Sequence, residues 1–169
     1  LISHFCTHGI VNASSRRELV DEESNIQTVD RGDRPFPLHP ELSTEPWRPD
    51  ICWFACDTSP EHGGETIICD GVRLAEELPP QVVETLTARR LKYSVQMTLG
   101  EFKLWFKSDE PSYDQLGHPP EGSPYEFFLD ENRLMRSFVT PGLYKPMFSE
   151  KLAFGNFLLF ARYFHDYKQ

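Results

Sequence analysis

The sequence has few basic residues. It holds 17 Lys and Arg against 26 Asp and Glu, which gives a formal net charge of −9 at pH 7. No basic run is longer than a pair such as Arg89-Arg90. Because contact with nucleic-acid phosphates draws on a concentrated basic patch, this distribution disfavours a nucleic-acid partner.

Long apolar runs are also absent. No stretch approaches the roughly 18 apolar residues of a membrane span. The residues from Leu1 onward lack the charged-then-apolar layout of a signal peptide. We therefore expect a cytoplasmic protein with no membrane partner, and homo-oligomerisation stays open.

Cysteine is scarce and shows no motif. The four cysteines form no Cys-x-x-Cys pair and have no zinc-ligand spacing: Cys6, Cys52, Cys56 and Cys69. This excludes a zinc ribbon or a redox dithiol motif. We expect free thiols in a reducing compartment, with the last three cysteines buried as small apolar side chains.

The remaining composition is that of a globular chain, with 39% apolar, 25% charged and 13% aromatic residues. Short apolar segments alternate with turn residues, which favours a mainly β fold with flanking helices. We expect strands at 51–58, 65–70 and 91–97, helices at 71–78 and 80–90, a loop at 108–126, and short strand-like pieces within 127–148. Asp70 is the expected cap of the first helix, and Pro80 stands near the start of the second.

One short motif carries metal chemistry. His39 and Glu41 flank Pro40, and in an extended segment they would project to the same side and could share one ion. An imidazole and a carboxylate are two thirds of the facial triad that leaves positions of Fe(II) open. Such a pair also occurs by chance in surface loops, so its context matters.

The context is a glycine pair between the first two expected strands. Gly63 and Gly64 permit positive φ, which allows the chain to approach a ligand or to make a hairpin turn. Thr66 follows them, 27 residues after His39.

Residues 38–71, which contain the His39-Pro40-Glu41 and Gly63-Gly64-Glu65-Thr66 motifs, resemble the TauD/TfdA-like branch of the Fe(II)/2-oxoglutarate dioxygenases. The resemblance implies that His39 and Glu41 bind the iron and that Thr66 helps to hold 2-oxoglutarate. It implies a double-stranded β-helix, or jelly roll, as the core. Trp53, Phe54, Trp105 and Phe154 are candidates for the lining of its pocket.

Two departures from the family pattern stand out. The family's distal motif, with a third histidine ligand and an arginine for 2-oxoglutarate, is not recognisable, and neither His118 nor His165 has its context. We therefore expect residues 1–169 to be a fragment of a single catalytic domain with an incomplete jelly roll. Glu41 stands where most members have aspartate, and a carboxylate there argues against the related halogenases.

The resemblance implies an oxidation by Fe(II), 2-oxoglutarate and O2 that releases succinate and CO2. Hydroxylation, desaturation and cyclisation all stay open, and we expect a small organic, amino-acid-like or secondary-metabolite substrate. Two alternatives remain: a cupin-type metalloenzyme without 2-oxoglutarate, and a non-catalytic β-sandwich binding module in which His39-Pro40-Glu41 is an ordinary turn.

Overall fold

The computed structural model describes residues 18–21, 26–29, 37–42, 45–108, 112–160 and 162. In chain order the elements of this part are β1 (Leu19–Asp21), β2 (Ile26–Gln27), α1 (Gly71–Glu77), α2 (Pro80–Ala88), β3 (Arg90–Gln96), α3 (Leu99–Phe106), the 3₁₀ helix η2 (Tyr113–Gly117), β4 (Glu126–Asp130) and β5 (Arg133–Pro141).

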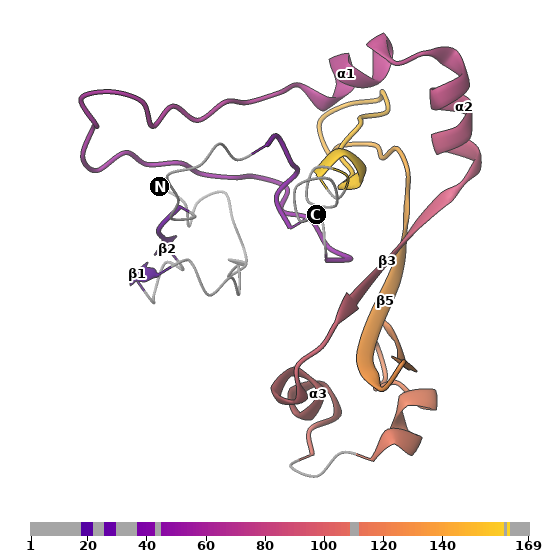
Figure 1. The fold of residues 1–169 in the computed structure, drawn as a ribbon. Coiled ribbons are helices and arrows are strands. Elements are labelled where there is room, and N and C mark those ends of the chain that lie inside the picture. Colours follow the sequence, from indigo (N-terminus) through magenta and orange to yellow (C-terminus); the bar gives the residue numbers. More distant parts are fainter. Residues whose placement is uncertain are drawn as a thin grey trace.

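The strands form two small antiparallel sheets. One joins β1 to β2, and the other has the order β3-β5-β4. The long ribbon of β3 and β5 runs through the body, with α1 and α2 at one end and α3 at the other (Figure 1). The prediction of sheets with flanking helices is confirmed, whereas the described residues do not form a jelly roll.

The β4–β5 hairpin turns through two residues with positive φ, Glu131 at 48° and Asn132 at 64°. Positive φ at both central positions defines the type I′ turn, whose twist matches that of the strands it joins. The register places Asp130 opposite Arg133, and a 2.7 Å ion pair links their side chains. This turn therefore sets the alignment of the whole hairpin.

The two predicted helices are confirmed. Asp70 caps α1 because its Oδ1 accepts hydrogen bonds from the backbone N–H groups of Val72 and Arg73, at 2.9 and 3.3 Å. Pro80 opens α2, where the missing N–H is not needed. The chain then enters β3 at Arg90, close to the predicted strand.

Helix α3 was not predicted. Thr98 caps it by accepting from the N–H of Glu101 at 3.1 Å, and the Glu101 carboxylate accepts from the N–H of Thr98 at 2.7 Å. This reciprocal capping box is visible in the sequence as Thr-x-x-Glu before an apolar run. The signal was present, and it places Phe102 in the core.

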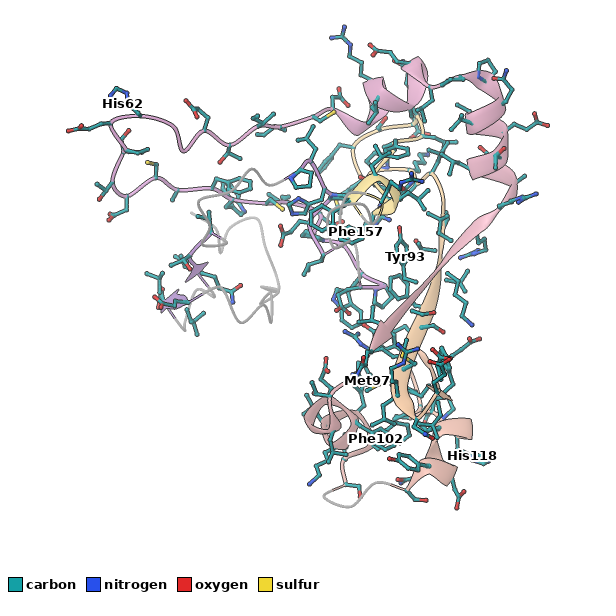
Figure 2. All side chains as sticks on the ribbon, viewed as in Figure 1. His62, Tyr93, Met97, Phe102, His118 and Phe157 are labelled. Atoms are coloured by element: carbon teal, nitrogen blue, oxygen red, sulfur yellow. The ribbon has the colours of Figure 1, made fainter. Side chains whose placement is uncertain are left out.

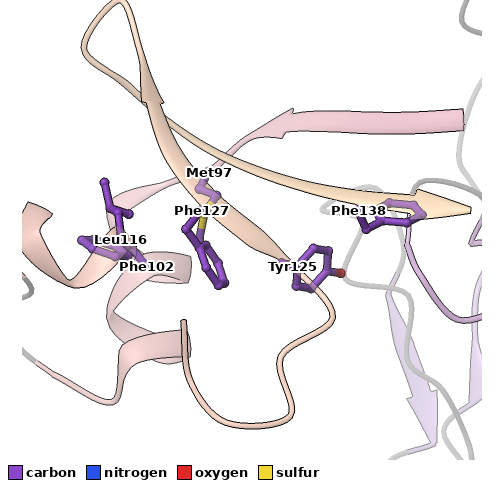
Figure 3. Close-up of a cluster of buried hydrophobic side chains, with 6 residues drawn as sticks. All are labelled: Met97, Phe102, Leu116, Tyr125, Phe127 and Phe138. Atoms are coloured by element: carbon purple, nitrogen blue, oxygen red, sulfur yellow. The ribbon is translucent and has the colours of Figure 1, made fainter. Parts of the chain in front are cut away.

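Two separate hydrophobic clusters lie at the two ends of the ribbon. The larger one packs α3, η2 and the three-stranded sheet around Met97, Phe102, Leu116, Tyr125, Phe127 and Phe138 (Figure 3). The smaller one joins α1 and α2 to the segment after β5 through Ala75, Leu86 and Leu143, with Phe154 packed against it. Gly142 belongs to this contact, since a Cβ there would stand 2.6 Å from the Leu86 carbonyl oxygen.

The predicted strands at 51–58 and 65–70 are wrong. Both segments lack strand structure, and they form the two sides of a long arm that carries His62 at its tip (Figure 2). The arm is exposed throughout, including Phe54 at 63% and Ile68 at 81%. Apolar, β-compatible residues form a strand only where a neighbouring strand accepts their backbone hydrogen bonds, and the described residues offer these segments none.

The same exposure corrects the prediction for the cysteines. Cys52, Cys56 and Cys69 all lie on the exposed arm rather than in a core. Within the described ranges, no helix combines the length and the apolar character needed to cross a membrane.

Candidate functional site

The predicted metal ligand His39 is held by a backbone hydrogen bond. Its Nδ1 lies 2.8 Å from the carbonyl oxygen of Pro37. A carbonyl can only accept, so Nδ1 carries the hydrogen, and in the neutral ring Nε2 carries the lone pair. Metal-binding histidines are oriented in this way, with the other ring nitrogen donating to a carbonyl or carboxylate.

Tilted aromatic contacts place the His39 ring against the C-terminal part of the described chain. The ring centroid of His39 is 5.0 Å from that of Phe160, which lies 4.2 Å from that of Phe157. The backbone N–H of Phe157 donates a 2.8 Å hydrogen bond to the hydroxyl of Tyr93 on β3. The loop that carries His39 is thus packed on residues 157–160 and, through them, on the ribbon.

Glu41 does not follow His39 in a strand. It lies in a turn in which Leu42 has a φ of 52° and the carbonyl of Leu42 accepts from the N–H of Glu45 at 2.9 Å. The alternation that would place positions 39 and 41 on one side therefore does not apply. Both side chains are partly buried.

Glu45, at the end of this turn, ties the loop to the sheet. Its two carboxylate oxygens accept from Nη1 and Nη2 of Arg136 on β5, both at 2.9 Å. The Tyr125 hydroxyl donates to the same carboxylate, and the guanidinium lies 4.6 Å from the centre of the Tyr125 ring. The pair is largely covered, with 12% of the Arg136 side chain and 21% of the Glu45 side chain exposed. We call Glu45, Tyr125 and Arg136 the loop brace.

The brace shifts the titration of its members. Burial would raise the pKa of Glu45, but the hydrogen bonds from Arg136 and Tyr125 outweigh it and hold the pKa below the ordinary 4.5. Burial and the hydrogen bond to Glu45 raise the pKa of Tyr125. Glu45 is therefore ionised and Tyr125 protonated at neutral pH, which is the state that the hydrogen bonds require.

A second arginine in the same loop has a different environment. The guanidinium of Arg48 lies 4.4 Å from the centre of the Tyr144 ring. Its Nη1 is shut off from solvent and has no hydrogen-bond partner among the residues that the structure describes. A buried donor left without an acceptor costs about 1–3 kcal/mol, and more when it is charged.

The predicted cosubstrate residue Thr66 lies on the exposed arm. Gly63 and Gly64 have φ values of 72° and 80°, which confirms that this turn needs residues tolerant of positive φ. The side of the arm that carries Thr66 is open to solvent.

The metal site is incomplete as it stands. In the residues that the structure describes, no three His, Cys, Asp or Glu side chains are grouped so that they could hold an ion. His118 is exposed at the end of η2, with its Nδ1 3.5 Å from the Asp114 carbonyl oxygen, and His165 lies outside the described residues.

The four proposed pocket residues are not brought together. Trp53 and Phe54 are on the exposed arm, Trp105 packs on the larger cluster, and Phe154 packs on the smaller one. Other residues, which the sequence motifs did not indicate, make the contacts around the His39 loop: Glu45, Arg48, Tyr93, Tyr125 and Arg136. Arg136 had a signal, since it is the one charged residue between Leu134 and Val139 in an apolar strand.

The loop carries an imidazole held by a backbone carbonyl and, two residues further on, the carboxylate of Glu41. The comparison with protein families is more specific: the sequence matches the family "Taurine catabolism dioxygenase TauD, TfdA family" over residues 5–135. The chain belongs to this family, whose enzymes are non-haem oxygenases that use Fe(II) and 2-oxoglutarate. No curated protein and no solved structure matches it.

Proposed function

We propose that this protein is an Fe(II)- and 2-oxoglutarate-dependent oxygenase of small organic or amino-acid-like substrates. The observation that carries the proposal is the orientation of His39, whose Nδ1 is engaged by the Pro37 carbonyl at 2.8 Å within a chain of this family. The donor set also fits, because an imidazole with a carboxylate suits a non-haem Fe(II) centre.

His39 would offer Nε2 to the iron, and Glu41 would offer a carboxylate oxygen. A third ligand completes the set, within a single catalytic domain whose jelly-roll core includes the β3-β5-β4 sheet. When bound, Fe(II) and 2-oxoglutarate supply the oxidation of a C–H bond by O2, with release of succinate and CO2.

The other residues would hold 2-oxoglutarate and keep the ligand loop in place. Thr66 would donate its hydroxyl to 2-oxoglutarate, which requires the arm to bring it beside the ligands. The loop brace keeps the segment after Glu41 fixed to β5, so that the two ligands keep one geometry. Hydroxylation, desaturation and cyclisation are all compatible with these roles.

The test is an anaerobic titration of the complete protein with Fe(II) and 2-oxoglutarate, followed by the weak visible metal-to-ligand charge-transfer absorption. We expect a band that is lost in His39→Ala and in Glu41→Ala. His118→Ala is the matched control, since His118 is exposed at the end of η2, at the end of the molecule away from α1 and α2 (Figure 2).

A band that persists in both ligand variants would refute the assignment of His39 and Glu41. No band in the folded wild-type protein would refute the oxygenase itself. Metal binding without a 2-oxoglutarate requirement would then indicate a cupin-type enzyme, and no metal binding would indicate a binding module.

A further inference from the structure

Among the described residues, Arg48 and Tyr93 each have a hydrogen-bond donor without an acceptor, in addition to the buried Nε of Arg136 in the loop brace. The donor on Arg48 is its Nη1, which is excluded from solvent and makes no hydrogen bond within the described ranges. A guanidinium is always charged and its N–H groups can only donate, so the missing group is an acceptor.

The second donor is the hydroxyl of Tyr93. Its oxygen already accepts from the N–H of Phe157 at 2.8 Å, which leaves its own hydrogen to be donated. Within the described part of the chain no acceptor takes that hydrogen. Figure 2 shows Tyr93 and Phe157 close to each other, on β3 and on the segment that packs over it.

Arg48 and Tyr93 are both linked to the segment from Gly155 to Phe157: Arg48 lies over Tyr144, which packs on Gly155, and Tyr93 accepts a hydrogen bond from Phe157. Burial raises the pKa of Tyr93, while the hydrogen bond from Phe157 and the positive charge of Arg48 act in the opposite direction, so the guanidinium lies within electrostatic reach of the hydroxyl. Both residues are partly buried, where such interactions are weakly screened.

The position of Arg48 is fixed by the segment that also carries the His39 contacts. Its guanidinium stacks on Tyr144, and Tyr144 lies directly on the backbone of Gly155, where a Cβ would stand 2.4 Å from Cε1 of the tyrosine. Two residues further along, Phe157 contacts the ring of Phe160, which in turn contacts the ring of His39. A group held by Arg48 and Tyr93 would therefore lie beside the segment 155–160, against which the predicted iron ligand His39 packs.

We propose that Arg48 and Tyr93 form a subsite that binds a carboxylate group of a molecule seated beside His39. One positive charge and two donors match a group with one negative charge and two oxygens, and guanidinium forks bind carboxylates through paired hydrogen bonds. The carboxylate belongs either to the organic-acid or amino-acid substrate or to 2-oxoglutarate. That this subsite belongs to an active site rests on the proposed function.

The experiment measures carboxylate binding in two ways on the complete protein. The first way uses metal-free protein with a chelator, and saturation-transfer NMR compares butyrate with its uncharged amide, butyramide. The second way measures the affinity for 2-oxoglutarate from the charge-transfer band with Fe(II). The variants are Arg48→Gln and Tyr93→Phe, which keeps the ring that stacks on Phe138 at 5.3 Å.

Arg73→Gln is the matched control, because Arg73 is an exposed arginine on α1 whose partner is Glu77. We expect Arg48→Gln to weaken the binding of the affected carboxylate at least about tenfold and Tyr93→Phe to weaken it about threefold or more. Arg73→Gln should change neither affinity. Thermal unfolding of each variant shows that it is folded before its affinity is compared.

Loss of butyrate affinity assigns the subsite to the substrate, and loss of 2-oxoglutarate affinity alone assigns it to the cosubstrate. Unchanged affinities in folded Arg48→Gln would overturn the proposal. It would also be overturned if the wild-type protein did not prefer butyrate to butyramide and its affinity for 2-oxoglutarate did not depend on Arg48. Arg48-dependent butyrate binding without any charge-transfer band would keep the subsite and refute the oxygenase.

Discussion

Glu45 and Arg136 face each other through two 2.9 Å hydrogen bonds, although 91 residues separate them in the chain. One belongs to the loop of the predicted iron ligands and the other to β5. The pair is largely shielded from solvent, and the Nη2 of Arg136 also lies 3.9 Å from Glu101 on α3. This contact makes the position of the loop depend on the three-stranded sheet.

Glu45→Ala should destabilise the protein by about 2–4 kcal/mol, because it leaves the covered charge of Arg136 without its partner. Chemical denaturation measures the free energy of unfolding. Glu126→Ala is the comparison, since Glu126 pairs with Lys92 at 2.8 Å but 70% of its side chain is exposed. Its removal should cost under about 1 kcal/mol. Equal losses in the two variants would contradict the special role of the loop brace.

The stability given by Glu45 should disappear in acid. Its pKa is lowered in the folded state, so the unfolded chain takes up the proton first and the contribution is complete above pH 4.5. It is then lost as the pH falls below this value through the folded pKa. The free energy of unfolding of wild type and Glu45→Gln, measured from pH 7 downward, should converge in that range. A difference that stays constant down to strongly acidic pH would rule out this linkage.

Phe102→Ala should be among the most destabilising changes in α3, with a loss of about 3–5 kcal/mol, because Phe102 is fully buried and the cavity cannot close. Leu104→Ala on the same helix is the control. Leu104 is 76% exposed, so its truncation should change stability by about 0.5 kcal/mol or less. Denaturant titrations measure both losses in the free energy of unfolding. A larger loss in Leu104→Ala than in Phe102→Ala would show that the orientation of α3 is wrong.

Thr66→Ala should weaken 2-oxoglutarate binding about 3- to 10-fold by removing one hydrogen bond, and Thr66→Ser should restore it. The dissociation constant follows from the charge-transfer titration. Thr58→Ala provides the control, because Thr58 lies exposed on the other side of the same arm. Equal affinities for wild type and Thr66→Ala would remove Thr66 from the cosubstrate site.

Sequence signals predicted correctly those features that depend on neighbouring residues, such as helix caps and turns. Asp70 and Pro80 predicted the starts of α1 and α2, and the glycine pair at 63 and 64 predicted positive φ. Capping and turn chemistry act within a few residues, so they can be recognised without the fold. Thr98 and Glu101 carried the same kind of signal for α3.

The strand predictions were wrong where the outcome depends on distant partners. Ile51–Thr58 and Glu65–Asp70 have the composition of strands, but the described structure pairs neither of them. Composition selects segments that suit a sheet, whereas pairing requires another segment in register.

The sequence alone determined the family motifs, the helix starts and the acidic balance of the surface, because each depends on residue type and short spacing. Only the tertiary structure decided that Glu45 meets Arg136, that His39 donates to Pro37 and contacts Phe160, and that Arg48 lies over Tyr144. These contacts join residues that are mostly far apart in the chain. Packing, rather than any local pattern, selects which buried donors meet an acceptor and which are left for a ligand.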